Sequence, residues 1–125
     1  MRILIVEDSA LVQRMYGLAF PVRQHTLVTA MNGREALALL DEADNPFDLI
    51  LLDLRMPDMN GVEFLAALQC RPVPSAPVVL TTAEPPDSSL IQEARARGVA
   101  AVVHKPWKPL ELQEVVRQVV PQEIP

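Results

Sequence analysis

The sequence is poor in cysteine, in aromatic residues and in basic residues, and it contains no long hydrophobic run. Cys70 is its one cysteine, which excludes an internal disulfide and fits a reducing compartment. Lysine and arginine number 11 against 16 acidic residues, so the net charge is −5 and no basic stripe is present for direct binding of nucleic acid. No stretch approaches the roughly 20 apolar residues of a membrane span, and the run Ile3 to Val6 is too short for the apolar region of a signal peptide. We therefore expect a cytoplasmic protein that does not insert into a membrane.

Hydrophobic residues make up 50% of the 125 residues and gather in short apolar runs separated by amphipathic stretches. This alternation is typical of βα repeats, in which parallel strands are buried on both faces. The length predicts one domain, which we place at residues 1–121, followed by a short tail over residues 122–125. The apolar runs predict strands over residues 3–6, 26–30, 49–52, 76–82 and 99–103. The amphipathic stretches predict helices over residues 11–18, 36–43, 61–68, 90–94 and 110–120.

Polar side chains stand at the ends of four of these strands. In chain order they are Glu7, Asp8, Asp53, Thr82 and Lys105. The carboxyl ends of parallel strands converge on one edge of a sheet, where ligands usually bind. Carboxylates crowded at such an edge repel one another and need a cation, and an oxygen-only cluster suits Mg²⁺. The lysine and the hydroxyl then suggest a phosphoryl group as a second ligand.

Five segments of the chain resemble the receiver domain of bacterial two-component response regulators, of the chemotaxis-regulator type. They are I-L-I-V-E-D-S at 3–9, N-G-x-E-A-L at 32–37, D-L-I-L-L-D-L-R-M-P-D-M-N-G at 48–61, V-V-L-T-T-A at 78–83 and H-K-P-W at 104–107. The resemblance covers essentially the whole chain. It implies a flavodoxin-like, doubly wound α/β fold, with a five-stranded parallel sheet of order 2-1-3-4-5 and helices on both faces.

The resemblance also implies a phosphorylation site with bound Mg²⁺. Asp53 resembles the phosphoacceptor, which takes a phosphoryl group from the phosphohistidine of a histidine kinase or a phosphotransfer protein. Asp8 resembles the direct Mg²⁺ ligand and Glu7 its outer-shell partner, and the metal set is completed by Asp53 and the backbone carbonyl of Arg55. Asp58, in the loop after Asp53, is interpreted as a turn residue or helix cap and not as a metal ligand.

Two further site residues are implied. Lys105 is expected to pair with the acids at rest and with a phosphoryl oxygen after transfer, and the family holds the Lys105–Pro106 bond cis. Thr82 is expected to bind the phosphoryl oxygen, because the family places a small residue next and Ala83 follows it. Strand alternation then points Thr81 to the opposite face.

The chain departs from the family three positions before the lysine, where Val102 stands in place of the usual aromatic residue. Valine has no ring to swing and is stiff at χ1. We expect phosphorylation to change the fourth and fifth strands and their helices through the loop from Ala83 to Ser88, with Glu84 exchanging a contact with Arg55. The downstream partner is unknown, and a phosphorylation-dependent dimer is allowed.

Three other functions agree less well with the sequence. A pseudo-receiver scaffold of the same fold that is never phosphorylated is disfavoured, because every residue of the chemistry is present. A phosphatase with an aspartate nucleophile usually needs a second aspartate where Arg55 stands, so we expect no enzyme beyond the chain's own phosphorylation and dephosphorylation. A dinucleotide-binding enzyme is excluded because no glycine-rich fingerprint follows the first strand.

Overall fold

The computed structural model describes residues 1–42, 46–56, 58–72 and 76–120. Within these ranges five strands alternate with five helices. The elements are β1 (Arg2–Val6), α1 (Ala10–Ala19), β2 (Thr26–Ala30), α2 (Gly33–Glu42), β3 (Leu49–Asp53), α3 (Gly61–Gln69), β4 (Val78–Thr82), α4 (Ser89–Ala96), β5 (Ala101–His104) and α5 (Pro109–Val119). The expected tail over residues 122–125 lies outside the described residues, so the domain boundary stays a prediction.

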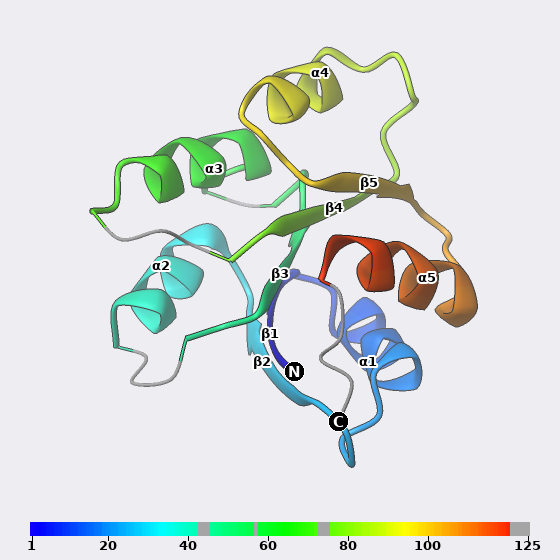
Figure 1. Ribbon diagram of the computed structural model, residues 1–125. Helices are drawn as coiled ribbons and strands as arrows, with labels where there is room; N and C mark the ends of the chain where they lie inside the picture. Colours follow the sequence, from blue (N-terminus) through cyan, green and yellow to red (C-terminus); the bar gives the residue numbers. More distant parts are fainter. Residues whose placement is uncertain (43–45, 57, 73–75, 121–125) are drawn as a thin grey trace.

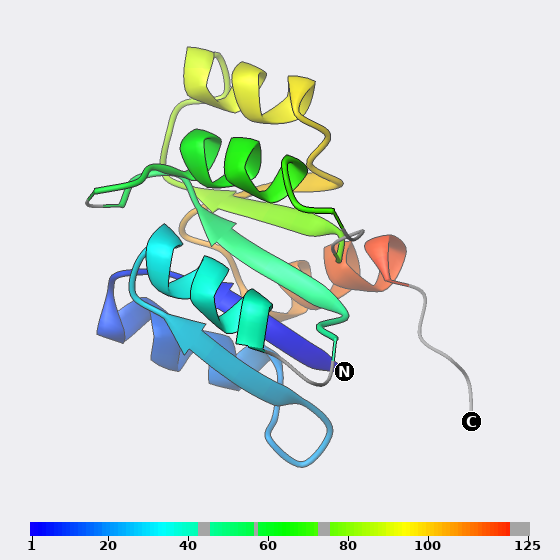
Figure 2. The same ribbon diagram turned by 90° about the vertical axis from the view of Figure 1, so that its left-hand side faces the viewer.

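The five strands form one parallel sheet in the order β2-β1-β3-β4-β5. Helices α1 and α5 cover one face of the sheet, and α2, α3 and α4 cover the other (Figure 1). The strands run in the same direction, so their carboxyl ends meet at one edge (Figure 2). The predicted fold class and strand order are confirmed.

The central strands are continuous apolar runs because helices cover them on both sides. The segments Ile3–Val6 and Leu49–Leu52 are completely buried. Their alternate side chains enter two separate cores, so that Leu4 packs with the α2, α3 and α4 side while Ile5 packs with the α1 and α5 side. This two-sided burial holds the strand ends, and the polar residues beyond them, in a rigid frame.

Two predicted strand boundaries were too early by two residues. β4 begins at Val78 and β5 at Ala101. Gly98 has φ +87° and ends the preceding helix, and the amide of Val99 still donates to the carbonyl of Ala94 in that helix. The backbone therefore joins the sheet ladder only after the helix end is complete.

Of the apolar residues Leu11, Met15 and Leu18, which predict the first helix from the sequence, only Met15 packs against the core. Leu11 is 67% exposed and Leu18 is 70% exposed, whereas Tyr16 and Ala19 are buried. Leu11 and Leu18 are seven residues apart and so form a stripe of their own on the outer side of the helix. Trp107 shares a core cluster with Leu112 and Val116 of α5 and also stacks on Tyr16 of α1. In the described part of the chain, no helix is both long enough and apolar enough to cross a membrane.

Candidate phosphoacceptor site

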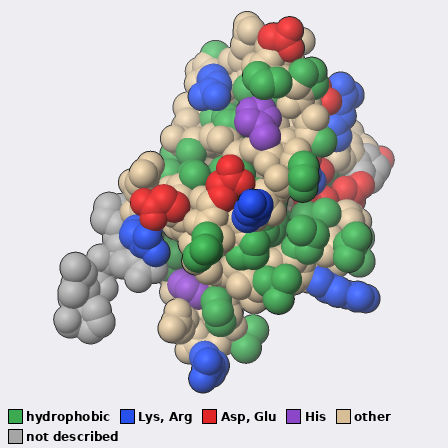
Figure 3. All heavy atoms as spheres, turned by 90° about the vertical axis from the view of Figure 1, so that its right-hand side faces the viewer, with side chains coloured by type: hydrophobic (Ala, Val, Ile, Leu, Met, Phe, Trp, Pro, Cys, Tyr) green, Lys and Arg blue, Asp and Glu red, His purple; other side chains and the backbone are tan. Residues whose placement is uncertain are grey.

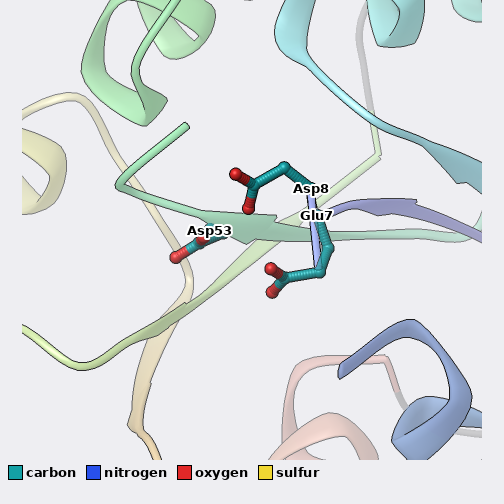
Figure 4. Close-up of side chains that lie close together, drawn as sticks. All are labelled: Glu7, Asp8 and Asp53. Atoms are coloured by element: carbon teal, nitrogen blue, oxygen red, sulfur yellow. The ribbon is translucent and has the colours of Figure 1, made fainter. Parts of the chain in front are cut away.

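Three carboxylates meet at the carboxyl edge of the sheet. Glu7 and Asp8 directly follow β1, and Asp53 ends β3; one oxygen from each lies within 4.8 Å of the others. Their carboxyl groups lie on the same side of the strand ends (Figure 4). Glu7 is 1% exposed and Asp53 is 6% exposed, while Asp8 faces the solvent. The three acids singled out in the sequence are therefore brought together, two of them out of contact with bulk water.

The turn from β1 into α1 positions the first two acids. Ser9 caps α1, with its Oγ accepting a hydrogen bond from the amide of Val12 at 3.3 Å. The amide of Ser9 donates to Glu7 Oε2 at 3.2 Å, which turns that carboxylate inward. Asp8 stands between the buried glutamate and the cap, at the rim of the site.

A close approach of backbone supports Asp53. The amide of Gly61 donates to the carbonyl of Leu54 at 2.8 Å, so the start of α3 lies against the end of β3. A Cβ on Gly61 would lie 2.9 Å from the Cα of Leu54 and 3.0 Å from the carbonyl oxygen of Asp53. Only glycine fits without moving the backbone that carries Asp53.

Lys105 faces the acids from β5. Its amide donates to the carbonyl of Thr82 at 2.7 Å, which extends the β4–β5 ladder by one residue. Its Nζ lies 2.9 Å from Glu7 Oε1 and 3.5 Å from Asp53 Oδ1. The expected pairing of the lysine with the acids is present, and the Lys105–Pro106 bond is cis as the resemblance implied.

The surroundings of Asp53 favour its protonated form. Burial and the neighbouring charge of Glu7 raise the pKa of Asp53 from 3.8 to about 6, against the opposing effects of Lys105 and of a backbone hydrogen bond from Arg55. One lysine thus compensates only part of the negative charge of three carboxylates.

The donor set fits a magnesium ion. Carboxylate oxygens are the ligands that Mg²⁺ prefers, and oxygens from three carboxylates converge here within 4.8 Å of one another. Asp58 has φ 68° and serves as a turn residue, as expected; of the described residues, Asn60 and not Asp58 caps α3. The part expected for the carbonyl of Arg55 stays a prediction.

The two threonines that end β4 have different partners. Thr81 Oγ1 lies 2.7 Å from the hydroxyl of Tyr16, on the α1 side of the sheet. Thr82 Oγ1 instead accepts the amide of Glu84 at 3.0 Å, at the start of the β4–α4 loop. This difference agrees with the expected alternation, and Thr82 keeps its hydroxyl proton to donate to a ligand.

The contact expected between Arg55 and Glu84 is present. The guanidinium of Arg55 donates from Nε to Glu84 Oε2 at 2.9 Å and from Nη2 to Oε1 at 3.2 Å. Ser88, which caps α4, donates its hydroxyl to the same Oε1 at 2.9 Å. Both hydrogen bonds lower the pKa of Glu84, and together they join the β3–α3 loop to the start of α4.

Sequence reasoning missed Tyr16, which is 1% exposed and stacks on Trp107 with ring centroids 4.9 Å apart. The signal was the spacing of Val12, Tyr16 and Ala19, which places the three side chains on one face of a helix. The stripe containing Leu11 and Leu18 is more hydrophobic and therefore suggested a different buried face.

Comparison with known proteins shows the family to which this fold and site belong. Residues 3–117 match the family model described as the response regulator receiver domain, and the chain belongs to this family of two-component signalling proteins. It is 36% identical over 117 residues to the regulatory protein AtoC of Escherichia coli (strain K12), a match that covers 94% of this chain and 24% of AtoC. It is 33% identical over 111 residues to the transcriptional regulatory protein ResD of Bacillus subtilis (strain 168), covering 89% of this chain and 44% of ResD.

The chain thus spans less than half the length of these curated relatives. A solved structure of the chemotaxis response regulator CheY4 of Vibrio cholerae matches with a TM-score of 0.82 and 32% identity, covering 94% of this chain and 97% of that one. The similarity therefore extends over the whole receiver fold.

Proposed function

We propose that this chain is a phosphorylation switch in which Asp53 accepts a phosphoryl group from the phosphohistidine of a histidine kinase or phosphotransfer protein, in a Mg²⁺-dependent reaction in the cytoplasm. The observation that carries the proposal is the position of Lys105 Nζ, 2.9 Å from Glu7 and 3.5 Å from Asp53. A buried carboxylate with a lysine and two further acids beside it is suited to receive a phosphoryl group.

The reaction moves one phosphoryl group between two side chains. A carboxylate oxygen of Asp53 attacks phosphorus, the P–N bond to the imidazole breaks, and the nitrogen keeps the electron pair. Lys105 exchanges part of its contact with Glu7 for a phosphoryl oxygen, and Thr82 donates its hydroxyl to another. Asp8, Asp53 and the carbonyl of Arg55, with Glu7 as their outer-shell partner, would hold Mg²⁺, which would supply positive charge against the phosphoryl oxygens.

The scaffold alternative, in which the site is never phosphorylated, has no observation in its favour. Glu7, Asp8 and Asp53 converge at one edge of the sheet, and Lys105 contacts Glu7 and Asp53, as phosphorylation chemistry requires. We also propose that the chain acts on no other substrate. At position 55, where a phosphatase would carry its second aspartate, Arg55 engages Glu84.

The phosphodonor has a suitable surface on α1. Leu11 and Leu18 are exposed there, and an apolar pocket of about 300 Å³ beside them is lined by Val12, Met15, Ala83, Lys105, Pro106 and Trp107. Hydrophobic side chains gather on the face formed by α1 and α5 (Figure 3). We propose that a helix of the donor packs on this face, because the pocket includes Lys105 and so continues directly into the phosphoacceptor site.

Phosphorylation is proposed to change the β4-α4-β5-α5 region through Glu84. Val102 packs half-buried against the core on the α4 side and has no ring to move. Glu84 is bound to Arg55 and Ser88 by its side chain and to Thr82 by its amide. Movement of Thr82 toward the phosphoryl group would therefore alter the loop that leads into α4. The contacts of Glu84 would then differ between the two states, as a switch requires.

Labelling with acetyl phosphate tests the function. With Mg²⁺, intact mass and phosphate-affinity gels should show one acid-stable, base-labile phosphoryl adduct, which Asp53→Asn abolishes and Asp58→Asn retains. Full labelling of Asp53→Asn would refute the assignment. Phosphotransfer from the histidine kinases of the same organism, compared between the parent and Leu18→Glu, tests the donor surface, since acetyl phosphate labelling should be equal in both.

Amide chemical shifts on addition of beryllofluoride and Mg²⁺ test the switch. We expect the largest changes over residues 82–88, little effect of Val102→Ala, and a blunted response in Glu84→Ala. Loss of the response in Val102→Ala together with a normal response in Glu84→Ala would contradict the loop-based switch.

A further inference from the structure

Two aromatic side chains, one on α1 and one just before α5, stack on each other close to the residues of the phosphoacceptor site. Tyr16 on α1 and Trp107 before α5 are the one tyrosine and the one tryptophan of the chain. Their rings stack with centroids 4.9 Å apart and planes inclined by 29°. Both side chains are almost completely buried, at 1% and 4% exposure.

The pair is connected to the site on both sides. The hydroxyl of Tyr16 is hydrogen-bonded to Thr81 Oγ1 at 2.7 Å, and Thr81 is the residue of β4 that pairs in register with Asp53. Trp107 lies two residues after Lys105, whose Nζ contacts Glu7 and Asp53. Tyr16 therefore touches the neighbour of the phosphoacceptor and the segment that carries the phosphate-binding lysine.

The pair is also connected to the surface. Val12 and Met15, which neighbour Tyr16 on α1, line the apolar pocket together with Lys105, Pro106 and Trp107. A shift of Trp107 relative to Tyr16 would therefore change the shape of this pocket. The shape of the α1 surface is thus linked to the position of the lysine.

We propose that Tyr16 is a positioning residue through which the phosphorylation state of Asp53 is transmitted to α1, by way of its stacking on Trp107. This inference rests on the proposed phosphorylation of Asp53 and goes beyond it. Before phosphorylation Lys105 is shared between Glu7 and Asp53; afterwards a phosphoryl oxygen attracts it, and the Lys105–Trp107 segment follows. The hydroxyl bond to Thr81 holds the tyrosine ring in place, so the movement of the tryptophan is passed to the helix rather than absorbed by rotation of Tyr16.

The route differs from the one through Glu84 because it leads to α1, whereas the loop that carries Glu84 leads to α4. α1 and α5 cover one face and α4 covers the other. One site would then change two surfaces, the one proposed for the donor and the one proposed for the output. A donor-facing surface that changes on phosphorylation would release the donor once transfer is complete.

Fluorescence of the single tryptophan tests the inference on the intact chain. We expect acetyl phosphate with Mg²⁺ to change Trp107 emission and to shift the amides of Val12 and Met15 in the parent protein. Tyr16→Phe keeps the ring but lacks the hydroxyl, so it should keep acetyl phosphate labelling while the amide shifts on α1 fall by about half or more. Arg14→Ala, at an exposed position of the same helix, is the matched control and should behave like the parent.

The outcomes separate this inference from the proposed function. Labelling of Asp53 with unchanged Trp107 emission and unchanged α1 shifts in the parent would overturn the inference and leave the function intact. Equal α1 shifts in Tyr16→Phe and in the parent would overturn the part assigned to the hydroxyl. Absence of any phosphoryl adduct in the parent would overturn both.

Discussion

Lys105 donates a hydrogen bond to Glu7 across the site, with Nζ 2.9 Å from Oε1, although 98 residues separate the two in the chain. Glu7 is 1% exposed, and a carboxylate buried to this degree is costly unless a partner compensates its charge. The lysine expected to bind a phosphoryl group therefore also keeps the resting site folded.

Replacing this lysine should impair both stability and phosphorylation. In Lys105→Ala the buried acids lose their cation, and we expect the free energy of unfolding to fall by about 2 kcal/mol. Mg²⁺ should still bind, while labelling by acetyl phosphate slows. Lys108→Ala, which removes the chain's other lysine at an exposed position, is the control and should change stability by less than about 0.5 kcal/mol. Equal effects of the two substitutions would contradict the compensating part assigned to Lys105.

Magnesium should stabilise the fold by relieving repulsion among three carboxylates. Because the site exists only in the folded state, Mg²⁺ at ten times its dissociation constant should add about 1.4 kcal/mol to the free energy of unfolding. Thermal melting with chelator and with millimolar Mg²⁺ measures this difference. Asp8→Asn should abolish the rise, whereas Asp58→Asn, which alters a nearby carboxylate of the turn, should retain it. An unchanged melting temperature of the parent protein on addition of Mg²⁺ would contradict a magnesium site at these three carboxylates.

Stability in the absence of metal should depend on pH through Asp53. Its pKa is raised from 3.8 to about 6, so between these values the folded state keeps a proton that the unfolded chain releases. The free energy of unfolding should therefore fall as the pH rises from about 4 to about 6, by at most about 3 kcal/mol, and stay low above that range. Urea unfolding in chelator should show this slope in the parent and in Asp58→Asn but not in Asp53→Asn. The same slope in Asp53→Asn would assign it to another group.

The position of Asp53 should also depend on Gly61. A methyl group there would lie 2.9 Å from the Cα of Leu54, so Gly61→Ala should lose about 1–3 kcal/mol of stability and slow labelling of Asp53. Gly17→Ala is the matched control, because a Cβ on this helical glycine meets nothing within 4 Å. We expect it to leave labelling unchanged and to raise stability by up to about 1 kcal/mol. If Gly61→Ala changed neither stability nor labelling, the end of β3 and the start of α3 could separate without a loss of free energy.

The sheet could be predicted from the sequence because its central strands are unbroken apolar runs, which parallel strands covered on both sides require. The site followed from the same pattern, since Asp53 closes the run Leu49–Leu52 and Lys105 follows the strand Ala101–His104. The buried face of α1 could not be predicted in this way. Hydrophobicity favoured Leu11 and Leu18 as buried residues. Tyr16 is buried instead, and its hydroxyl is hydrogen-bonded to Thr81, 65 residues further along the chain. Such a pairing is decided by tertiary structure, so the spacing of Val12, Tyr16 and Ala19 did not outweigh the more hydrophobic stripe.

Chemical mapping of the phosphoryl group tests the central claim most directly. The parent protein is phosphorylated with acetyl phosphate and Mg²⁺ and then reduced with borohydride, which converts an aspartyl phosphate into homoserine that peptide mass spectrometry can locate. We expect homoserine at position 53 and none at Asp8 or Asp58. Homoserine at either of those positions, or none in a protein that has acquired the phosphoryl group, would contradict the assignment of Asp53 as the phosphoacceptor.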